Sequence, residues 1–287
     1  MMFTKTISIL SLSLFSFGAY AIAEVKNELD PKFFANKEIQ RTSPHAFALQ
    51  PEAHAFLKTT RAQELTERLR FLQAIETNTD LVASIHAFST LSWESKLGVL
   101  KKVFELEVKS LGIEAPELII QSDLISGPAY FDFDVTKSGS GRVILNPSAL
   151  EKEADPYLSL NLLIHETRHS AQFQLAFDTR ASMPPSELAQ GFQAAFRAQK
   201  ELKGRLSYID FCTLLNEYEA FQFGNFVLGN LLGWEKEFLD MGTFASQYQK
   251  DGLLRIDLLQ LFEGNQTSSI LDRFNELEWV QYRLLKP

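Results

Sequence analysis

The clearest pattern along the chain is a mostly apolar stretch over residues 157–177 that carries a regular stripe of polar side chains. These polar residues recur at steps of three and four, which at about 100° per residue places them on one side of an α-helix. The stripe consists of Asn161, His165, Arg168, His169 and Gln172. Polar groups on an otherwise apolar helix need a reason, so the pattern predicts a helix whose polar side has a specific role.

The N-terminal part of the chain is predicted to be helical after a short arm. Residues 24–50 are polar, contain prolines and keep no sustained period, which predicts an extended arm or linker. Residues 51–75 have the pattern of one long amphipathic helix, and residues 80–111 that of one or two more, with a possible start at Ser92. We therefore expect an N-terminal helical region over residues 51–112.

Short segments rich in Ile, Val and aromatic residues follow this region and predict β-strands. They cover residues 117–121, 130–135 and 142–146. The last two segments are joined by a Ser-Gly-Ser-Gly turn and are typical of a β-hairpin. Phe131 and Phe133 alternate with Asp132 and Asp134, which predicts one buried and one solvated face.

The rest of the chain is again helical in pattern. Helices are predicted over residues 186–203, 207–232, 235–249, 253–262 and 268–285. The elements together predict an α+β fold that is mainly helical, with a small mixed or antiparallel sheet and flanking helices. Residues 113–287 are expected to form the region that carries the chemistry.

Composition and charge narrow the class of protein. The chain has 287 residues, of which 45% are hydrophobic, so it can bury a sizeable core. It has 28 basic and 36 acidic side chains, and this acidic balance argues against a general nucleic-acid binder, which needs a basic surface for phosphates. Cys212 is the only cysteine, which excludes an intrachain disulfide, and its apolar setting predicts a buried thiol.

Residues 1–23 have the features of a cleaved signal peptide. Lys5 precedes an apolar run, and Ala21 and Ala23 are small residues at the positions that a signal peptidase inspects, so cleavage is expected after Ala23. The run is short for a membrane span, and an uncleaved anchor is the alternative. Export without disulfides favours a bacterial periplasmic or secreted protein with no stable membrane insertion after cleavage.

The polar stripe contains a metal-binding spacing. His165 and His169 stand four residues apart, about one helical turn, so both imidazoles can point at one atom, and Glu166 lies beside the first. This H-E-x-x-H arrangement is the zinc-hydrolase signature and predicts a Zn²⁺ site. The alternative is a pair of core histidines bonded to backbone carbonyls or to nearby carboxylates.

A catalytic zinc takes three protein ligands and keeps one position open, so a third ligand is expected downstream. Glu217 and Glu219 are the candidates, in a predicted helix among Leu and Phe residues. They stand two residues apart, about 200° around a helix, so only one can face the metal. An acid turned inward there would be costly unless it is neutralised or bound to a cation. Alternatively, both are surface acids of an amphipathic helix.

These motifs resemble a known family. The sequence HETRH, followed later by a helix that reads E-Y-E-A, resembles the gluzincin branch of the zincin metallopeptidases. The second motif is similar to the E-Y-x-A-D of membrane and periplasmic proteases in that branch. The resemblance implies a zincin-like catalytic core, with His165, His169 and Glu217 as zinc ligands. The chain departs from the family at Phe221, where the family has Asp, so Glu219 remains an alternative ligand.

The resemblance also implies a reaction. A peptide or protein substrate would be cleaved at an amide bond by zinc-activated water, with Glu166 as general base. The donor for the oxyanion is expected near these segments, and the candidates are Arg168, Arg205, Tyr208 and Tyr218. The alternative function is that of a non-catalytic periplasmic binding or scaffold protein on a zincin-like fold.

Overall fold

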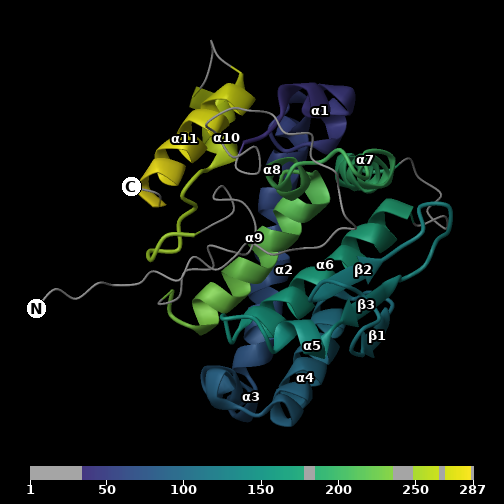
Figure 1. Ribbon diagram of the computed structural model, residues 1–287, viewed down its shortest axis with the longest axis vertical. Coiled ribbons are helices and arrows are strands. Elements are labelled where there is room, and N and C mark those ends of the chain that lie inside the picture. Colours follow the sequence, from purple (N-terminus) through teal and green to yellow (C-terminus); the bar gives the residue numbers. More distant parts are fainter. Residues whose placement is uncertain (1–33, 178–184, 235–247, 265–268, 286–287) are drawn as a thin grey trace, which may run out of the picture.

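The computed structural model of the protein describes residues 34–177, 185–234, 248–264 and 269–285 (Figure 1). The longer helices are α2 (His54–Glu76), α3 (Thr79–His86), α4 (Trp93–Leu111), α6 (Leu158–Phe177), α7 (Glu187–Glu201), α9 (Leu215–Leu231) and α11 (Ile270–Leu285). The shorter ones are α1 (Lys37–Thr42), α5 (Pro147–Leu150), α8 (Tyr208–Cys212) and α10 (Leu258–Gly264). The prediction of a mainly helical α+β fold is confirmed. None of the described helices combines the length and apolar character that a membrane span requires.

A small mixed sheet lies against α6 (Figure 1). Its strands are β1 (Glu117–Ile120), β2 (Ala129–Asp132) and β3 (Arg142–Leu145), in the order β1-β3-β2. Strand β1 is parallel to β3, and β2 is antiparallel to it, with Phe131 opposite Val143. The predicted hairpin is therefore confirmed. Phe131 and Phe133 are buried as expected, while Asp132 forms an ion pair with Arg142 near the surface.

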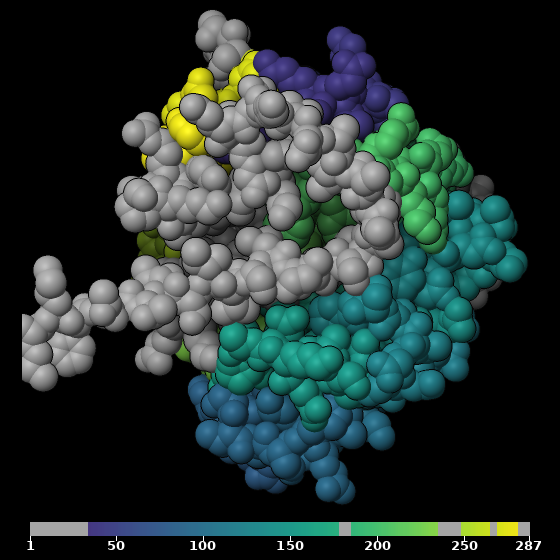
Figure 2. Space-filling model, viewed as in Figure 1, coloured from purple at the N-terminus to yellow at the C-terminus, as the bar shows by residue number. Residues whose placement is uncertain are grey.

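Helix α6 is the central element of the packing. It contacts α9, α7, α4 and the strands β2 and β3, and nearly all of its side chains are buried, including those of the polar stripe. A surface helix would bury only one side, so this enclosure explains why apolar residues surround the stripe. In the space-filling view, the blue surface of α3 and α4 is continuous with the teal surface of the following segments (Figure 2).

Helices α6 and α9 approach each other closely. A Cβ atom at Gly224 would lie 2.6 Å from Oδ1 of Asn161, so a larger residue at this point of α9 would force the buried Asn161 side chain to move. Beside it, the Asn161 side-chain amide donates to Oδ1 of Asn225 at 3.0 Å. Asn161 lies one turn before His165, and Gly224 lies two turns after Glu217, so the helices run antiparallel and bring these two residues together.

The prediction of an extended arm over residues 24–50 is wrong for its described part. Asn36 caps α1, and the following chain makes a short 3₁₀ turn over Pro44–Ala46. Phe47 is completely buried and forms an isolated bridge with Leu214. Such short turns show no regular spacing of hydrophobic residues. Residues distant in the sequence hold them in place, and the local sequence does not reveal these partners. The predicted signal peptide and the start of the arm lie outside the described residues.

Most helix predictions are confirmed, but one predicted helix is divided into two and another begins at a later residue. Ser92 caps α4 by accepting from the backbone N–H of Ser95, and Ser186 caps α7 in the same way. The single helix predicted over residues 207–232 is instead α8 and α9, because Leu214 adopts an extended conformation to pair with Phe47. Helix α10 begins later than predicted. The helix predicted over 235–249 lies almost entirely outside the described residues.

Replacing Gly224 with Ala should destabilise the protein by about 1–3 kcal/mol, since the added methyl group overpacks the contact between α6 and α9. Urea unfolding followed by circular dichroism would measure the change. Gly98→Ala is the matched control: this exposed residue lies inside α4 with nothing within 4 Å of the place that an added methyl group would take, and it should gain about 0.5–1 kcal/mol. Equal effects of the two variants would contradict the close approach.

Candidate metal site

Three ligand-type atoms from two helices converge at the middle of the protein. Nε2 of His165 and Nε2 of His169 on α6 lie 2.9 Å apart. Oε2 of Glu217 on α9 lies 3.1 Å from the first nitrogen and 3.2 Å from the second. All three side chains are buried, with 3% of each residue exposed. The two predicted histidines and Glu217 are thus in mutual contact.

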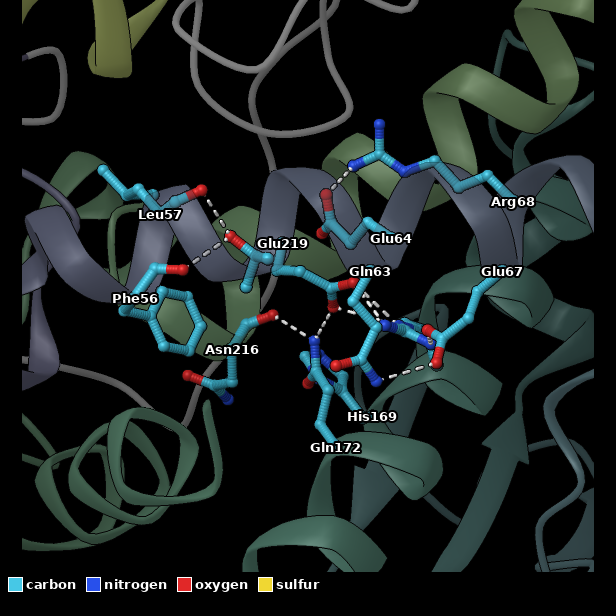
Figure 3. A network of polar contacts seen from close by, with 12 residues as sticks. Phe56, Leu57, Gln63, Glu64, Glu67, Arg68, His169, Gln172, Asn216 and Glu219 are labelled. Carbon is cyan, nitrogen blue, oxygen red and sulfur yellow. Dashed lines mark hydrogen bonds and ion pairs between the residues drawn. The ribbon is translucent and has the colours of Figure 1, made fainter. Parts of the chain in front are cut away.

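Glu219 faces a different partner. Its carboxylate accepts from Nε of Arg168 at 2.8 and 3.1 Å and also from the Gln172 amide (Figure 3). Arg168 in turn forms an ion pair at 2.7 Å with Glu67 on α2. Because Glu217 and Glu219 point to opposite sides of α9, one meets the imidazoles and the other meets the guanidinium. Neither is a surface acid.

Glu166 lies beside the two imidazoles. One carboxylate oxygen of Glu166 and one ring nitrogen each of His165 and His169 all lie within 4.8 Å of one another, and among the described residues this group could hold a metal ion. Burial raises the pKa of Glu166 to about 8, although His169 and a hydrogen bond from the Phe131 backbone act in the opposite direction. The carboxyl group can therefore take up and release a proton near neutral pH.

Charges within the group balance one another. Burial alone would lower the pKa of His169, but Glu217, Glu166 and Gln172 together outweigh it and raise this pKa to about 9. Burial alone would raise the pKa of Glu217, but the imidazoles, His169 foremost, lower it to about 2. The pKa of His165 is lowered by burial and by its neighbour His169. Without a metal, one ion pair between His169 and Glu217 therefore forms at pH 7.

Gln199 supports the site from α7 and had no signal in the sequence. Its Nε2 donates to Oε1 of Glu217 at 3.1 Å, and its Oε1 accepts from Nδ2 of Asn216 at 2.9 Å. The bond occupies the glutamate oxygen that faces away from the histidines and so orients the other. Gln199 belongs to an ordinary amphipathic helix, and only the tertiary packing reveals its partner.

A cavity of about 20 Å³ adjoins the group, which is room for one or two water molecules. Much of its wall is aromatic: Tyr130, Phe131, Phe133, Phe196, Phe211 and Phe221. Phe221 packs on the His165 ring with the centroids 4.1 Å apart. Within the described part of the chain, Nδ1 of His165 has no hydrogen-bond partner. Phe221, at the sequence position where the motif of the gluzincin proteases has Asp, thus packs against this imidazole.

None of the four residues expected to stabilise an oxyanion lines this cavity in the described structure. Arg168 is bound by Glu219 and Glu67 instead. Tyr130 and Gln199 line the cavity, and the sequence did not single out either residue.

No family model matches the chain, and neither a curated protein nor a solved structure is significantly similar to it. The resemblance to gluzincins therefore depends on the two short motifs and on the geometry of their side chains.

Arg168→Met should destabilise the protein by about 3–5 kcal/mol, because it leaves the buried Glu219 carboxylate without its main cation. Chemical denaturation at pH 7 would measure the loss. The control is Arg273→Met, which removes an exposed ion pair with Glu276 and should change stability by less than about 1 kcal/mol. A similar small change in both variants would show that the buried pair contributes little.

Proposed function

We propose that this protein is a zinc-dependent hydrolase of the gluzincin type that cleaves amide bonds in peptides or proteins. The observation that carries the proposal is the convergence of His165, His169 and Glu217 on one point, with Glu166 beside them. Export to a bacterial periplasm or medium belongs to the same proposal and depends on residues 1–23, which lie outside the described residues.

The donor atoms suit zinc. Tetrahedral zinc with bonds of about 2.0–2.1 Å separates its ligand atoms by roughly 3.3–3.4 Å. The three separations in the structure, from 2.9 to 3.2 Å, lie within a few tenths of an ångström of that value. Two histidines and one glutamate are a donor set of catalytic zinc, in which one position stays open for water. The adjoining cavity provides space for that water.

The chain's own residues would handle the protons. Zinc, when bound, supplies Lewis acidity that polarises a carbonyl and makes water a stronger acid. Glu166 would accept a proton from the attacking water and then pass it to the leaving amine, acting first as base and then as acid. The Phe131 backbone N–H, which donates to Glu166, would hold the carboxylate in place for both transfers.

The walls of the site support a peptide substrate with apolar side chains. Strand β2 forms an edge of the described sheet, and its residues Ala129–Phe131 line the cavity, so an extended peptide substrate would lie along this edge. The aromatic side chains around the cavity favour apolar over charged groups next to the scissile bond.

Wild-type protein should contain one zinc ion per chain, and His165→Ala and Glu217→Ala should each lose it. Glu166→Gln should keep the metal and lose casein or peptide cleavage by about 100-fold or more, because the proton acceptor is gone. Elemental analysis and a cleavage assay with and without chelator would measure both properties. His86→Ala, at an exposed position on α3, is the control that should change neither.

Metal-free wild-type protein would overturn the proposal. Stoichiometric zinc with no chelator-sensitive cleavage would favour the alternative of a non-catalytic binding or scaffold protein. Loss of zinc in Glu219→Ala but not in Glu217→Ala would reassign the third ligand.

Zinc binding should release at least one proton at pH 7. The pKa of His169 is about 9 in the absence of metal, so its imidazole is protonated at neutral pH and must lose a proton to bind zinc. Apparent affinity should consequently rise with pH up to about 9. Titration calorimetry in two buffers of different ionisation enthalpy would count the protons, and binding without proton release would contradict the proposed role of His169.

A further inference from the structure

We propose that Gln172 is a positioning residue that fixes the tautomer of His169, so that Nε2 of this histidine keeps its lone pair for the metal. The inference depends on the proposed zinc site and adds a role for residues that are not ligands. It also gives the buried Glu219, which does not face the imidazoles, a part in the same site.

The orientation of the Gln172 amide follows from its partners. Its nitrogen donates to the Asn216 backbone carbonyl at 2.9 Å and to the Glu219 carboxylate. Both partners are acceptors, so the reverse orientation would place the amide oxygen against two other oxygens. The oxygen must therefore be the atom that lies 2.8 Å from Nδ1 of His169.

This orientation determines where the imidazole carries its proton. An amide oxygen only accepts hydrogen bonds, so Nδ1 of His169 must be the donor. In a neutral imidazole the other nitrogen, Nε2, then has a free lone pair. Nε2 is the atom that lies 2.9 Å from His165 and 3.2 Å from Glu217, at the proposed metal position.

A chain of buried polar contacts holds Gln172 in turn. Arg168 donates to Glu219 through Nε and Nη2, and its Nη1 reaches Glu67 on α2. Figure 3 shows this network running from α2 to Gln172 and His169. Because Glu219 is 2% exposed and bound on two sides, it cannot easily turn away from the amide. The position of His169 is thus tied to three helices.

The two histidines differ in this support. Nδ1 of His165 has no hydrogen-bond partner in the described structure, and Phe221 packs against that ring. Only His169 has its tautomer set by a bonded neighbour. Removing Gln172 would leave both imidazoles free to place a proton on the nitrogen that zinc requires, so affinity should fall.

The test compares Gln172→Met with Gln174→Met. Gln174 lies on the same helix and makes hydrogen bonds to Glu114 and Ser170 at the surface, away from the imidazoles. Zinc affinity would be measured by competition with a chelator. Gln172→Met should bind zinc about 10- to 100-fold more weakly than wild type, and Gln174→Met within about twofold. Unfolding curves would identify any general loss of stability.

A second measurement needs no variant. Nitrogen NMR of the zinc-loaded wild type should place the proton of His169 on Nδ1 and show that it exchanges slowly with solvent, because Gln172 accepts it. Equal zinc affinity in wild type and Gln172→Met, or a metal on Nδ1 of His169, would overturn the inference while leaving the zinc site intact. Wild type and Gln174→Met that both lack zinc would overturn the proposed function itself.

Discussion

The buried ion pair between Arg168 on α6 and Glu219 on α9 is the interaction on which the arrangement of the central helices depends. Taking two charges out of water is expensive, and the cost is offset only when both have several hydrogen-bond partners. Arg168 meets this condition through Glu219 and Glu67 together, so it joins α2, α6 and α9. Burial raises the pKa values of the neighbouring Glu64 and Glu107 well above normal, although Arg68 opposes the shift at Glu64 and Arg168 opposes it at Glu107, so burial favours the uncharged form of both acids.

The same pair sets the register of the candidate metal site. Arg168 lies between His165 and His169 along α6, and Glu219 lies two residues after Glu217 on α9. Once the guanidinium meets Glu219 on one side of α9, the opposite side carries Glu217 toward the imidazoles. A one-residue slip between the helices would separate both pairs at once. The contact between α6 and α9 thus places both the ion pair and the candidate metal ligands, and the close approach at Gly224 assists it.

Local spacing predicts part of this arrangement. The four-residue interval places both histidines on one stripe, and the two-residue interval shows that only one acid can join them. Which acid does so depends on the long-range register of α6 against α9, and sequence periodicity contains no information about that register. The same lack of long-range information explains why the prediction of an extended arm over residues 24–50 is wrong. Phe47 is buried and forms a bridge with Leu214, and that contact also divides the helix predicted over 207–232. The contact of Gln199 with Glu217 could not be predicted from spacing, because the two residues belong to different helices.

The partners of the three candidate ligands also bear on the chemistry. Neutral amides contact two of them, Gln172 at His169 and Gln199 at Glu217. Nδ1 of His165 has no hydrogen-bond partner among the described residues, and the Phe221 ring packs against this imidazole. A carboxylate partner would raise the basicity of a histidine ligand more than an amide does, because it adds negative charge near the imidazole. In the proposed zinc enzyme, an amide partner would therefore give a lower metal affinity than a carboxylate partner would. The metal would in return keep more of its positive charge, and this is the property that polarises a carbonyl.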